Sequence, residues 1–113
     1  MKTLTDFKKR IQIGAKVACT YHQETKKDAN GKQLVGEDGR AIRYALDRGV
    51  REVSQVQTNA FTLKTTKTDG SIVDSWCHYP KASQCTFEDG KITINETNRE
   101  GVIYPLLTYS FPN

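Results

Sequence analysis

Three cysteines and two histidines are the residues of this chain that could hold a metal ion or act as nucleophiles: Cys19, His22, Cys77, His78 and Cys85. Zinc in proteins takes four such ligands, generally from two closely spaced pairs. Cys19 and His22 are three residues apart in a strand-like segment, and the other pair is adjacent, so the two members of each pair face opposite sides of a strand. We therefore predict no metal site, and we interpret the cysteines as small buried hydrophobic residues.

The chain carries no pattern typical of a catalytic centre. A thiol nucleophile needs a neighbouring group that lowers its pKa, whereas these cysteines stand near apolar side chains such as Trp76 and Phe87. The adjacent carboxylates at 37–38 and 88–89 fall in turn-forming segments, and there is no glycine-rich phosphate-binding loop. We therefore predict that the protein has no catalytic residues, is not an enzyme and requires no cofactor.

Length and composition indicate one ordinary domain. The chain has 113 residues, of which 27% are charged and 36% hydrophobic, and it is long enough to bury a core without disulfide or metal support. It has no apolar run of about 18 residues, and its first residues lack the apolar segment of a secretory signal. We expect a cytoplasmic protein that does not bind membranes.

A short helix is predicted at the N-terminus, over residues 3–12. Leu4, Phe7 and Ile11 recur at the spacing of one helical face. Thr3 or Thr5 can serve as the N-cap. A helix this short is not stable alone in water, so it must pack its apolar face on the rest of the domain.

The following residues have the pattern of short strands separated by turns, which predicts a mainly β fold. Segments rich in Val, Ile, Thr and aromatic residues alternate with turn-forming residues such as Asp89-Gly90. The predicted strands are residues 15–22, 50–57, 60–66, 71–79, 84–88 and 91–95. The predicted core comprises Phe7, Ile11, Val17, Cys19, Tyr21, Val53, Val56, Phe61, Leu63, Trp76, Phe87, Ile92 and Ile94.

Two segments outside these strands are candidates for recognition. Residues 23–49 are polar and rich in Lys and Arg, and we expect a long loop there, with a two-stranded finger formed by 32–35 and 40–44. Residues 98–113 are apolar and aromatic and contain two prolines, which favours an extended edge segment. This tail either closes the fold or docks on a partner.

Basic residues are concentrated in the first half of the chain. Residues 1–51 carry 12 Lys or Arg and 6 Asp or Glu, a balance of +6, and residues 52–113 carry 5 and 7, a balance of −2, which gives the net charge of +4. Basic side chains combined with stacking aromatic residues are typical of single-strand nucleic-acid binding. The residues that would carry this function are Lys8, Lys9, Arg10, Lys26, Lys27, Arg51, Trp76 and Tyr79.

Protein recognition through the loop and the tail is the competing hypothesis. Loops on a rigid scaffold commonly carry binding residues, and Tyr and Arg are enriched at the centres of protein interfaces. On this hypothesis the partner contacts are Arg40, Arg43, Tyr44, Arg48, Tyr109 and Phe111.

The order of elements from about residue 13 to 95 resembles the small five-stranded barrel of the Src-homology and Tudor type. The long loop at 23–49, the hairpin turn Thr68-Asp69-Gly70 and a short helical turn near 79–83 correspond to features of that fold. The chain lacks the clustered acidic residues and aromatic cage with which such proteins bind proline-rich peptides or methyl-lysine. The resemblance therefore implies the fold and not those activities.

The chain as a whole is also similar to small single-domain proteins of bacteriophages and mobile elements, with a short amphipathic start, a compact β body and a divergent tail. Some such proteins inhibit host-defence nucleases, including CRISPR effectors, by binding them. We therefore expect a non-enzymatic module that occupies the surface of a partner protein. The alternative is a small barrel that binds nucleic acid.

Overall fold

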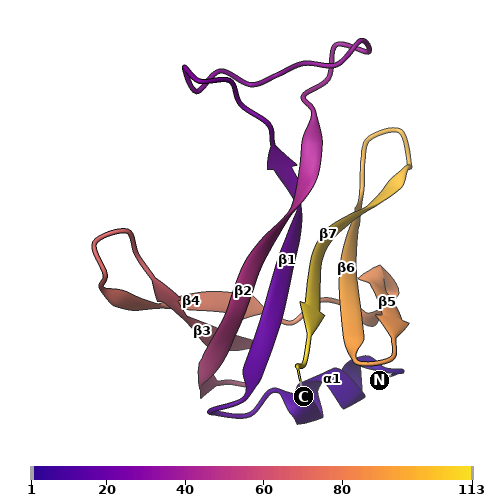
Figure 1. The fold of residues 1–113 in the computed structure, drawn as a ribbon. Helices are drawn as coiled ribbons and strands as arrows, with labels where there is room; N and C mark the ends of the chain where they lie inside the picture. The colour runs from indigo at the N-terminus through magenta and orange to yellow at the C-terminus, as the bar shows by residue number, and fades with distance from the viewer. Residues whose placement is uncertain (1, 113) are drawn as a thin grey trace.

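The computed structural model describes residues 2–112 and contains one open antiparallel sheet (Figure 1). Its helices are α1 (Leu4–Arg10) and the 3-10 helix η1 (Ala82–Gln84). Its strands are β1 (Lys16–Thr25), β2 (Arg43–Val56), β3 (Ala60–Thr66), β4 (Ile72–His78), β5 (Cys85–Glu88), β6 (Lys91–Thr97) and β7 (Ile103–Ser110). The strand order is β4-β3-β2-β1-β7-β6-β5, so β4 and β5 are the two edges.

The mainly β character predicted from the sequence is confirmed, but this sheet is not the closed five-stranded barrel implied by the resemblance. The C-terminal strand β7 lies between β1 and β6, which gives the sheet seven strands with two free edges. Figure 1 shows β3 and β4 running across the lower ends of the longer strands β1 and β2. At the lower end of the molecule, β3 and β4 therefore lie across β1 and β2, and at the upper end nothing crosses these strands in this view.

The C-terminal segment is a central strand, which corrects the prediction of an extended edge tail. β7 pairs with β1 on one side and with β6 on the other. Proline removes a hydrogen bond from a central strand and is tolerated where one side of the strand is unpaired. Pro105 satisfies this rule because the β1–β7 pairing ends at Leu107, so at Pro105 strand β7 is paired only with β6.

The N-terminal helix forms as the sequence predicts, because both its cap and its apolar face are satisfied. Thr3 Oγ1 accepts a hydrogen bond from the Asp6 backbone N–H (3.1 Å), and the Asp6 carboxylate accepts one from the Thr3 N–H (3.2 Å). This reciprocal arrangement is a capping box. The helix then buries Phe7 and Ile11 against the sheet.

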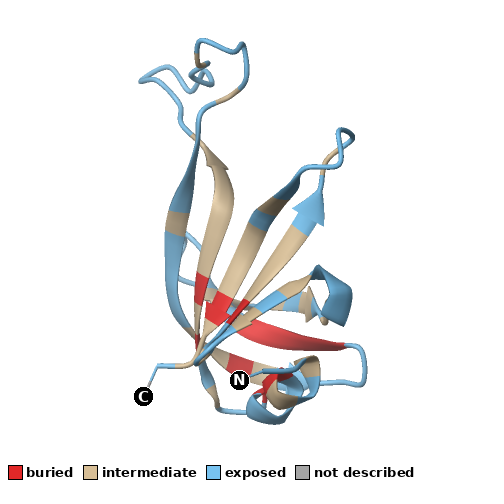
Figure 2. Cartoon of the chain, turned by 90° about the vertical axis from the view of Figure 1, so that its right-hand side faces the viewer, coloured by how far each residue is buried: buried red, intermediate tan, exposed pale blue. Residues whose placement is uncertain are grey.

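Phe7 is the centre of an aromatic cluster that joins the helix to the sheet. Its ring lies 5.7 Å from the ring of Tyr109, 5.8 Å from Phe111, and 6.1 Å from both Phe61 and Tyr79, measured between centroids. These contacts connect α1 to β3 and β7. Figure 2 shows that the buried residues gather at this end of the molecule, which we call the base, while the opposite end is exposed.

The buried side chains confirm most of the predicted core and correct part of it. The predicted residues that are buried are Phe7, Ile11, Val17, Cys19, Val53, Phe61, Leu63 and Ile92. Phe87 and Ile94 are half-buried and pack against this core. Tyr21 is half-buried but is not part of the core cluster. Trp76 and Val56 are 53% and 40% exposed, so their assignment to the core is wrong.

Trp76 is exposed because β4 presents its other face to the core. Alternate residues of a strand point to opposite faces, and in β4 the half-buried residues are Val73, Ser75 and Cys77. The indole of Trp76 therefore projects outward, on the same face as Ile72, which is 66% exposed.

The predicted loop 23–49 is shorter than expected because both flanking strands extend into it. β1 continues to Thr25 and pairs there with Arg43, the first residue of β2. The connection is therefore residues 26–42, and the expected finger is represented by single antiparallel bridges, Lys27 with Gln33 and Val35 with Ala41.

Candidate partner-binding site

The sheet divides into two hairpins at the end opposite the base. β1 and β7 pair only where residues 18–21 face residues 107–110. Beyond this point β1 stays paired with β2 as far as Thr25, and β7 stays paired with β6 from Ile103. The β1–β2 hairpin and the β6–β7 hairpin therefore separate as two prongs (Figure 1), and we call this end of the molecule the fork.

Pro105 explains why the two prongs separate where they do. Gln23 Nε2 donates a hydrogen bond to the Pro105 carbonyl oxygen at 2.7 Å, so this carbonyl faces β1. The N–H and C=O of one residue in an antiparallel strand point to the same neighbour. Because proline has no N–H, the backbone bond that would extend the β1–β7 ladder cannot form. The side chain of Gln23 spans the wider gap instead.

A groove of about 830 Å³ lies between the prongs, and we call it the fork groove. Both prongs contribute to its walls. The side chains that define its chemistry are Tyr21, Gln23, Arg40 and Arg43 from the β1–β2 hairpin and its loop, and Tyr104 and Leu106 from β7. The groove thus combines two phenol rings, an aliphatic side chain, an amide and two guanidinium groups with the carboxylates of Asp38 and Glu96.

One ion pair connects the prongs across the top of the groove. Arg40 Nη2 lies 3.3 Å from Glu100 Oε1, and both side chains are more than 60% exposed. On the wall of the groove, Tyr104 donates its hydroxyl hydrogen to Glu96 at 3.1 Å. This hydrogen bond to the carboxylate raises the pKa of the Tyr104 phenol, so the phenol stays protonated at neutral pH.

Arg43 is the groove cation with unused binding capacity. Its Nη1 donates to the backbone oxygen of Gln23 at 3.0 Å, and a guanidinium group has five N–H donors. No carboxylate of the described residues lies within ion-pair distance of Arg43. The remaining donors suit a carboxylate or a carbonyl oxygen, to which arginine can bind through two parallel hydrogen bonds.

A third arginine, Arg48, packs on the ring of Tyr21 at the lower end of the groove. The guanidinium carbon of Arg48 lies 4.7 Å from the centre of this ring, within the range of a cation–π interaction. Tyr21 itself is half-buried and lines the groove. The predicted partner residue Arg48 is therefore held next to the groove through Tyr21.

The loop that ends the β1–β2 prong contains a repeat that our reading of the sequence missed. Asn30-Gly31-Lys32 and Asp38-Gly39-Arg40 occupy equivalent turns eight residues apart, and both glycines have positive φ, 81° and 78°. Each turn closes through a backbone bond across it, from Asp28 N to Lys32 O and from Gly36 N to Arg40 O, both 2.9 Å. The matching Gly and basic positions were visible in the sequence.

The two turns are joined at their stems by a ring of three backbone hydrogen bonds. Lys26 N donates to Ile42 O, Ile42 N to Leu34 O, and Leu34 N to Lys26 O, at 2.9–3.0 Å. These residues are also eight apart in sequence. This ring gives the loop internal order without a hydrophobic core, and it presents Lys32 and Arg40 from equivalent turns.

The structure brings together only part of the predicted partner-binding set. Arg40 and Arg43 line the fork groove. Tyr44 follows Arg43 in β2, so its side chain, 39% exposed, points to the opposite face and does not line the groove. Tyr109 is only 3% exposed in the core, so its assignment as a partner contact is wrong. Phe111 is half-buried at the base, under the guanidinium of Arg10 at 4.6 Å and beside Phe7. Both aromatic residues of the tail stabilise the base.

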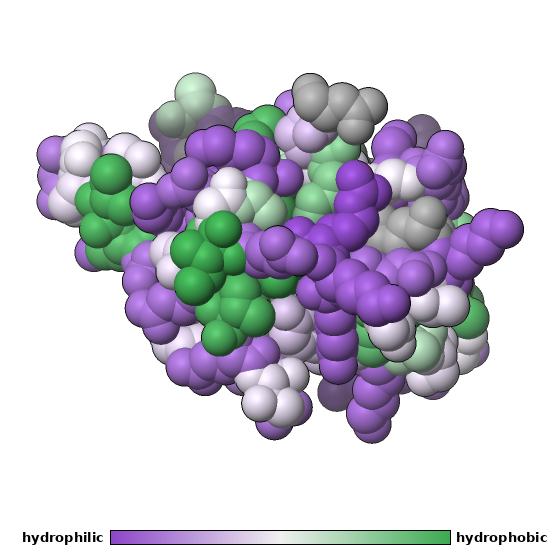
Figure 3. All heavy atoms as spheres, turned by 90° about the horizontal axis from the view of Figure 1, so that it is seen from below, coloured by the Kyte–Doolittle hydropathy of each residue, from purple (hydrophilic) through white to green (hydrophobic). Residues whose placement is uncertain are grey.

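The residues of the nucleic-acid hypothesis are distributed over separate parts of the molecule. Lys8, Lys9 and Arg10 are in α1 at the base, whereas Lys26 and Lys27 belong to the loop at the opposite end (Figure 1). Seen from the base end, the surface is mostly hydrophilic and its apolar side chains form small separate patches (Figure 3).

The other three members of that set are also engaged in different places. Arg51 donates to Thr65 Oγ1 at 3.2 Å between β2 and β3. Tyr79 packs on Phe7, with Lys8 Nζ 5.0 Å from its ring centre. Trp76 is exposed on the outer face of β4. Tyr79 therefore lies beside the cations of α1, but these cations are at the opposite end of the molecule from Lys26 and Lys27 of the loop.

The cysteines and histidines of the described residues do not gather in one metal-binding cluster. Burial raises the pKa of the Cys19, Cys77 and Cys85 thiols, which keeps them protonated at neutral pH. His22 Nε2 shares a hydrogen bond with Thr108 Oγ1 at 2.7 Å on the outer face of the sheet. Among residues 2–112, no three His, Cys, Asp or Glu side chains are close enough together to hold a metal ion.

Comparisons with protein families, with curated proteins and with solved structures find no match to this chain. Within the described part of the chain, no helix has the length and apolar character needed to cross a membrane.

Proposed function

We propose that the protein is a non-enzymatic binding module that acts by occupying the surface of a partner protein, and that the fork is its contact surface. The observation that carries this proposal is the separation of β1 from β7 beyond Tyr21 and Leu107. It leaves two strand edges facing each other across a groove that contains Arg43, Tyr21 and Tyr104. Open strand edges offer backbone donors and acceptors to another chain.

The side chains of the fork fit the energetics of protein recognition. Tyr and Arg are the residue types most enriched where binding free energy is concentrated in interfaces. Exposed apolar residues stand beside them, with Val102 and Ile103 on the β6–β7 prong 55% and 69% exposed. A partner segment that enters the groove would bury these side chains and bind the free donors of Arg43.

Nucleic-acid binding is less well supported by the geometry. Phosphate contacts need several cations along the path of one backbone, and here the basic residues of α1 and of the loop are at opposite ends of the molecule. The resemblance to small phage proteins suggests the class of partner. We therefore also propose that the partner is a cytoplasmic protein such as a host-defence nuclease of the CRISPR type.

Photo-crosslinking at two surface positions tests this proposal. A benzoylphenylalanine replaces Val102, which lines the groove, in one variant and Ile13 near the base in a control variant, at sites that are 55% and 73% exposed. Each variant is irradiated in lysate of the natural host, with and without nuclease. We expect a discrete protein adduct from the Val102 variant only, and we expect nuclease to leave it unchanged.

Salt separates the two kinds of partner in the same experiment. Nucleic-acid affinity falls by orders of magnitude from about 50 to about 200 mM salt for a protein with many phosphate contacts, whereas an interface with an apolar centre changes much less. An adduct that disappears with nuclease or with salt would contradict the proposal. Equal adducts from both positions would also contradict it, because the fork would then not be the contact surface.

A further inference from the structure

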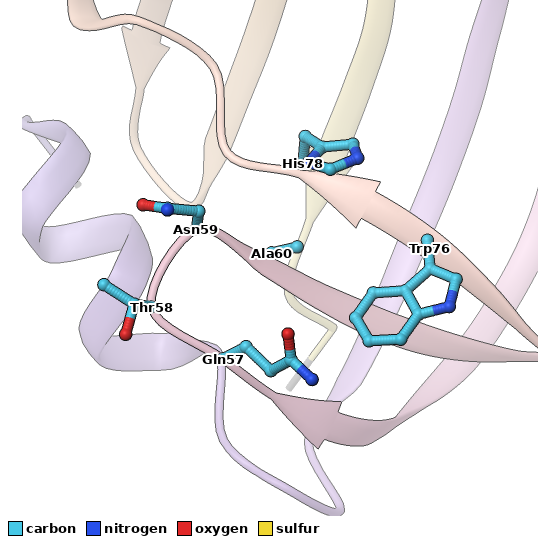
Figure 4. Close-up of a pocket in the computed structure, with 6 residues that line it drawn as sticks. All are labelled: Gln57, Thr58, Asn59, Ala60, Trp76 and His78. Atoms are coloured by element: carbon cyan, nitrogen blue, oxygen red, sulfur yellow. The ribbon is translucent and has the colours of Figure 1, made fainter.

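A second hollow lies on the outer face of β3 and β4, and it shares no residue with the fork groove. Its volume is about 480 Å³. It is lined by Gln57, Thr58, Asn59, Ala60, Trp76 and His78 (Figure 4). We call it the Trp76 hollow.

Strand register explains why the surface is hollow at this point. Ala60 pairs with His78 and Thr62 with Trp76, and the small side chain of Ala60 leaves space beside two large ones. Trp76 and His78 are two residues apart in β4, so they project from the same face. Figure 4 shows the indole ring lying beside Ala60 and Gln57, with its face toward the viewer.

The polar side chains around the ring are not needed to hold the turn that carries them. The β2–β3 turn is held by backbone bonds, from Gln57 N to Ala60 O at 2.8 Å and from Tyr79 N to Asn59 O at 3.1 Å. The side chains of Gln57, Asn59 and His78 line the hollow and are exposed, so they are accessible to a ligand. Two amides and an imidazole thus offer both donors and acceptors.

We propose that the Trp76 hollow binds a neutral sugar residue of a glycan. One face of a pyranose ring presents C–H groups that pack on an aromatic ring, while its hydroxyl groups both donate and accept hydrogen bonds. An exposed indole surrounded by amides and an imidazole matches this pattern. Pockets of this kind use apolar and aromatic contact area with a few convergent polar groups to fix orientation.

The composition of the lining favours a neutral ligand over a negatively charged nucleotide. Among residues 2–112, no Lys, Arg, Asp or Glu lines the hollow, so the lining offers a phosphate no lysine or arginine to pair with. A nucleobase could also stack on Trp76, but nucleic-acid affinity depends on neutralising the backbone charge. A shallow site for one sugar ring is expected to bind weakly, with a Kd on the order of 1 mM.

The fluorescence of Trp76 tests this inference directly, because the chain contains one tryptophan. The full-length protein is titrated to tens of millimolar with maltotriose, cellotriose and chitotriose, and separately with the oligonucleotide dT10. We expect a saturable emission change with at least one trisaccharide, unaffected by salt. We expect at least a tenfold weaker response in the Gln57→Ala/Asn59→Ala double variant, whose turn is held by backbone bonds.

Arg43→Ala is the matched control, since it lies in the fork and should leave the sugar response unchanged. Failure of the fork proposal would therefore not affect this result. The inference is overturned if none of the three trisaccharides produces a saturable change. It is also overturned if dT10 alone produces one and the response weakens with salt, because Trp76 would then stack on bases.

Discussion

The base and the fork are built from the same sheet but are stabilised in different ways. At the base, α1, β3 and β7 enclose an aromatic cluster around Phe7, which is completely buried. At the fork, order comes from backbone hydrogen bonds in the loop and from exposed contacts such as the Arg40–Glu100 pair. Apolar burial dominates folding stability, whereas exposed polar contacts contribute little.

This difference shows how a small domain can separate stability from recognition. Regions with few buried apolar contacts open at low free-energy cost, and binding segments are commonly found there. The β1–β7 pairing near residues 18–21 connects the two regions. We therefore expect substitutions at the base to change stability strongly and substitutions at the fork to change binding with little effect on stability.

The largest expected effect is the loss of a base aromatic residue. Phe61 is completely buried and contacts the rings of Phe7, Tyr79 and Tyr109. Phe61→Ala should lower the free energy of unfolding by about 3–5 kcal/mol, the usual loss for a buried aromatic side chain. Chemical denaturation measures this change.

Tyr44→Ala in the fork is the matched control, because Tyr44 is an aromatic residue that is 39% exposed. It should change the unfolding free energy by less than about 0.5 kcal/mol. Similar losses for the two substitutions would show that the base and the fork do not differ in the way described.

Alkaline pH should destabilise the base through Tyr109. Burial raises the pKa of the Tyr109 phenol above its ordinary value of 10.0. The unfolded chain therefore releases this proton at lower pH than the folded protein does. Stability is fully present below pH 10 and falls as pH rises above it, because only the unfolded state gains the ionised form.

Tyr109→Phe should flatten this fall in unfolding free energy above about pH 10, measured by denaturation across an alkaline series. If Tyr109→Phe showed the same slope as the parent, titration of this buried phenol would not be the cause.

Replacement of the fork loop should leave the base folded. The loop residues 27–41 include no buried side chain, and the neighbouring strands still pair at Thr25 and Arg43. A short Gly-Ser connection in their place should preserve a single cooperative thermal transition close to that of the parent. The same variant should lose the partner adduct predicted for the fork. A strongly lowered or broadened transition would mean that the loop contributes to the folding of the base.

The smallest expected effect concerns the ion pair across the groove. Arg40→Ala should cost at most about 1 kcal/mol of unfolding free energy, since exposed pairs contribute about 0.2–1 kcal/mol. Glu100→Ala is the matched variant, and the double variant completes a thermodynamic cycle. A coupling free energy well above this range would show that the ion pair is needed to hold the two prongs together.

The sequence was sufficient to predict those elements that are determined by residues close together in the chain. β3 has the predicted bounds, 60–66, because a strand-like run is flanked by turn residues on both sides. Helix α1 forms where the apolar spacing and the Thr3 cap place it. The prediction of the buried positions Val17, Val53 and Ile92 followed from strand alternation.

The predictions that were wrong concern features that depend on contacts between residues distant in sequence. Alternation along β4 defines two faces but does not show which face meets the core, so Trp76 was assigned to the wrong one. The pairing of Tyr109 with Cys19 joins residues 90 positions apart, and the aromatic pattern of the tail does not identify this partner strand. The fork groove exists only because of that pairing, so its position could not be predicted from the sequence.

Native-state hydrogen exchange, followed residue by residue by NMR, tests the contrast between base and fork most directly. Amides near Cys19, Val53 and Leu63, which lie in the buried core, should exchange only through global unfolding. Amides in the loop 26–42 and those facing the groove near Gln23 should exchange with far smaller opening free energies. Equal protection at the base and the fork, at the level of global unfolding, would contradict the division of the molecule into a stable base and an open binding end.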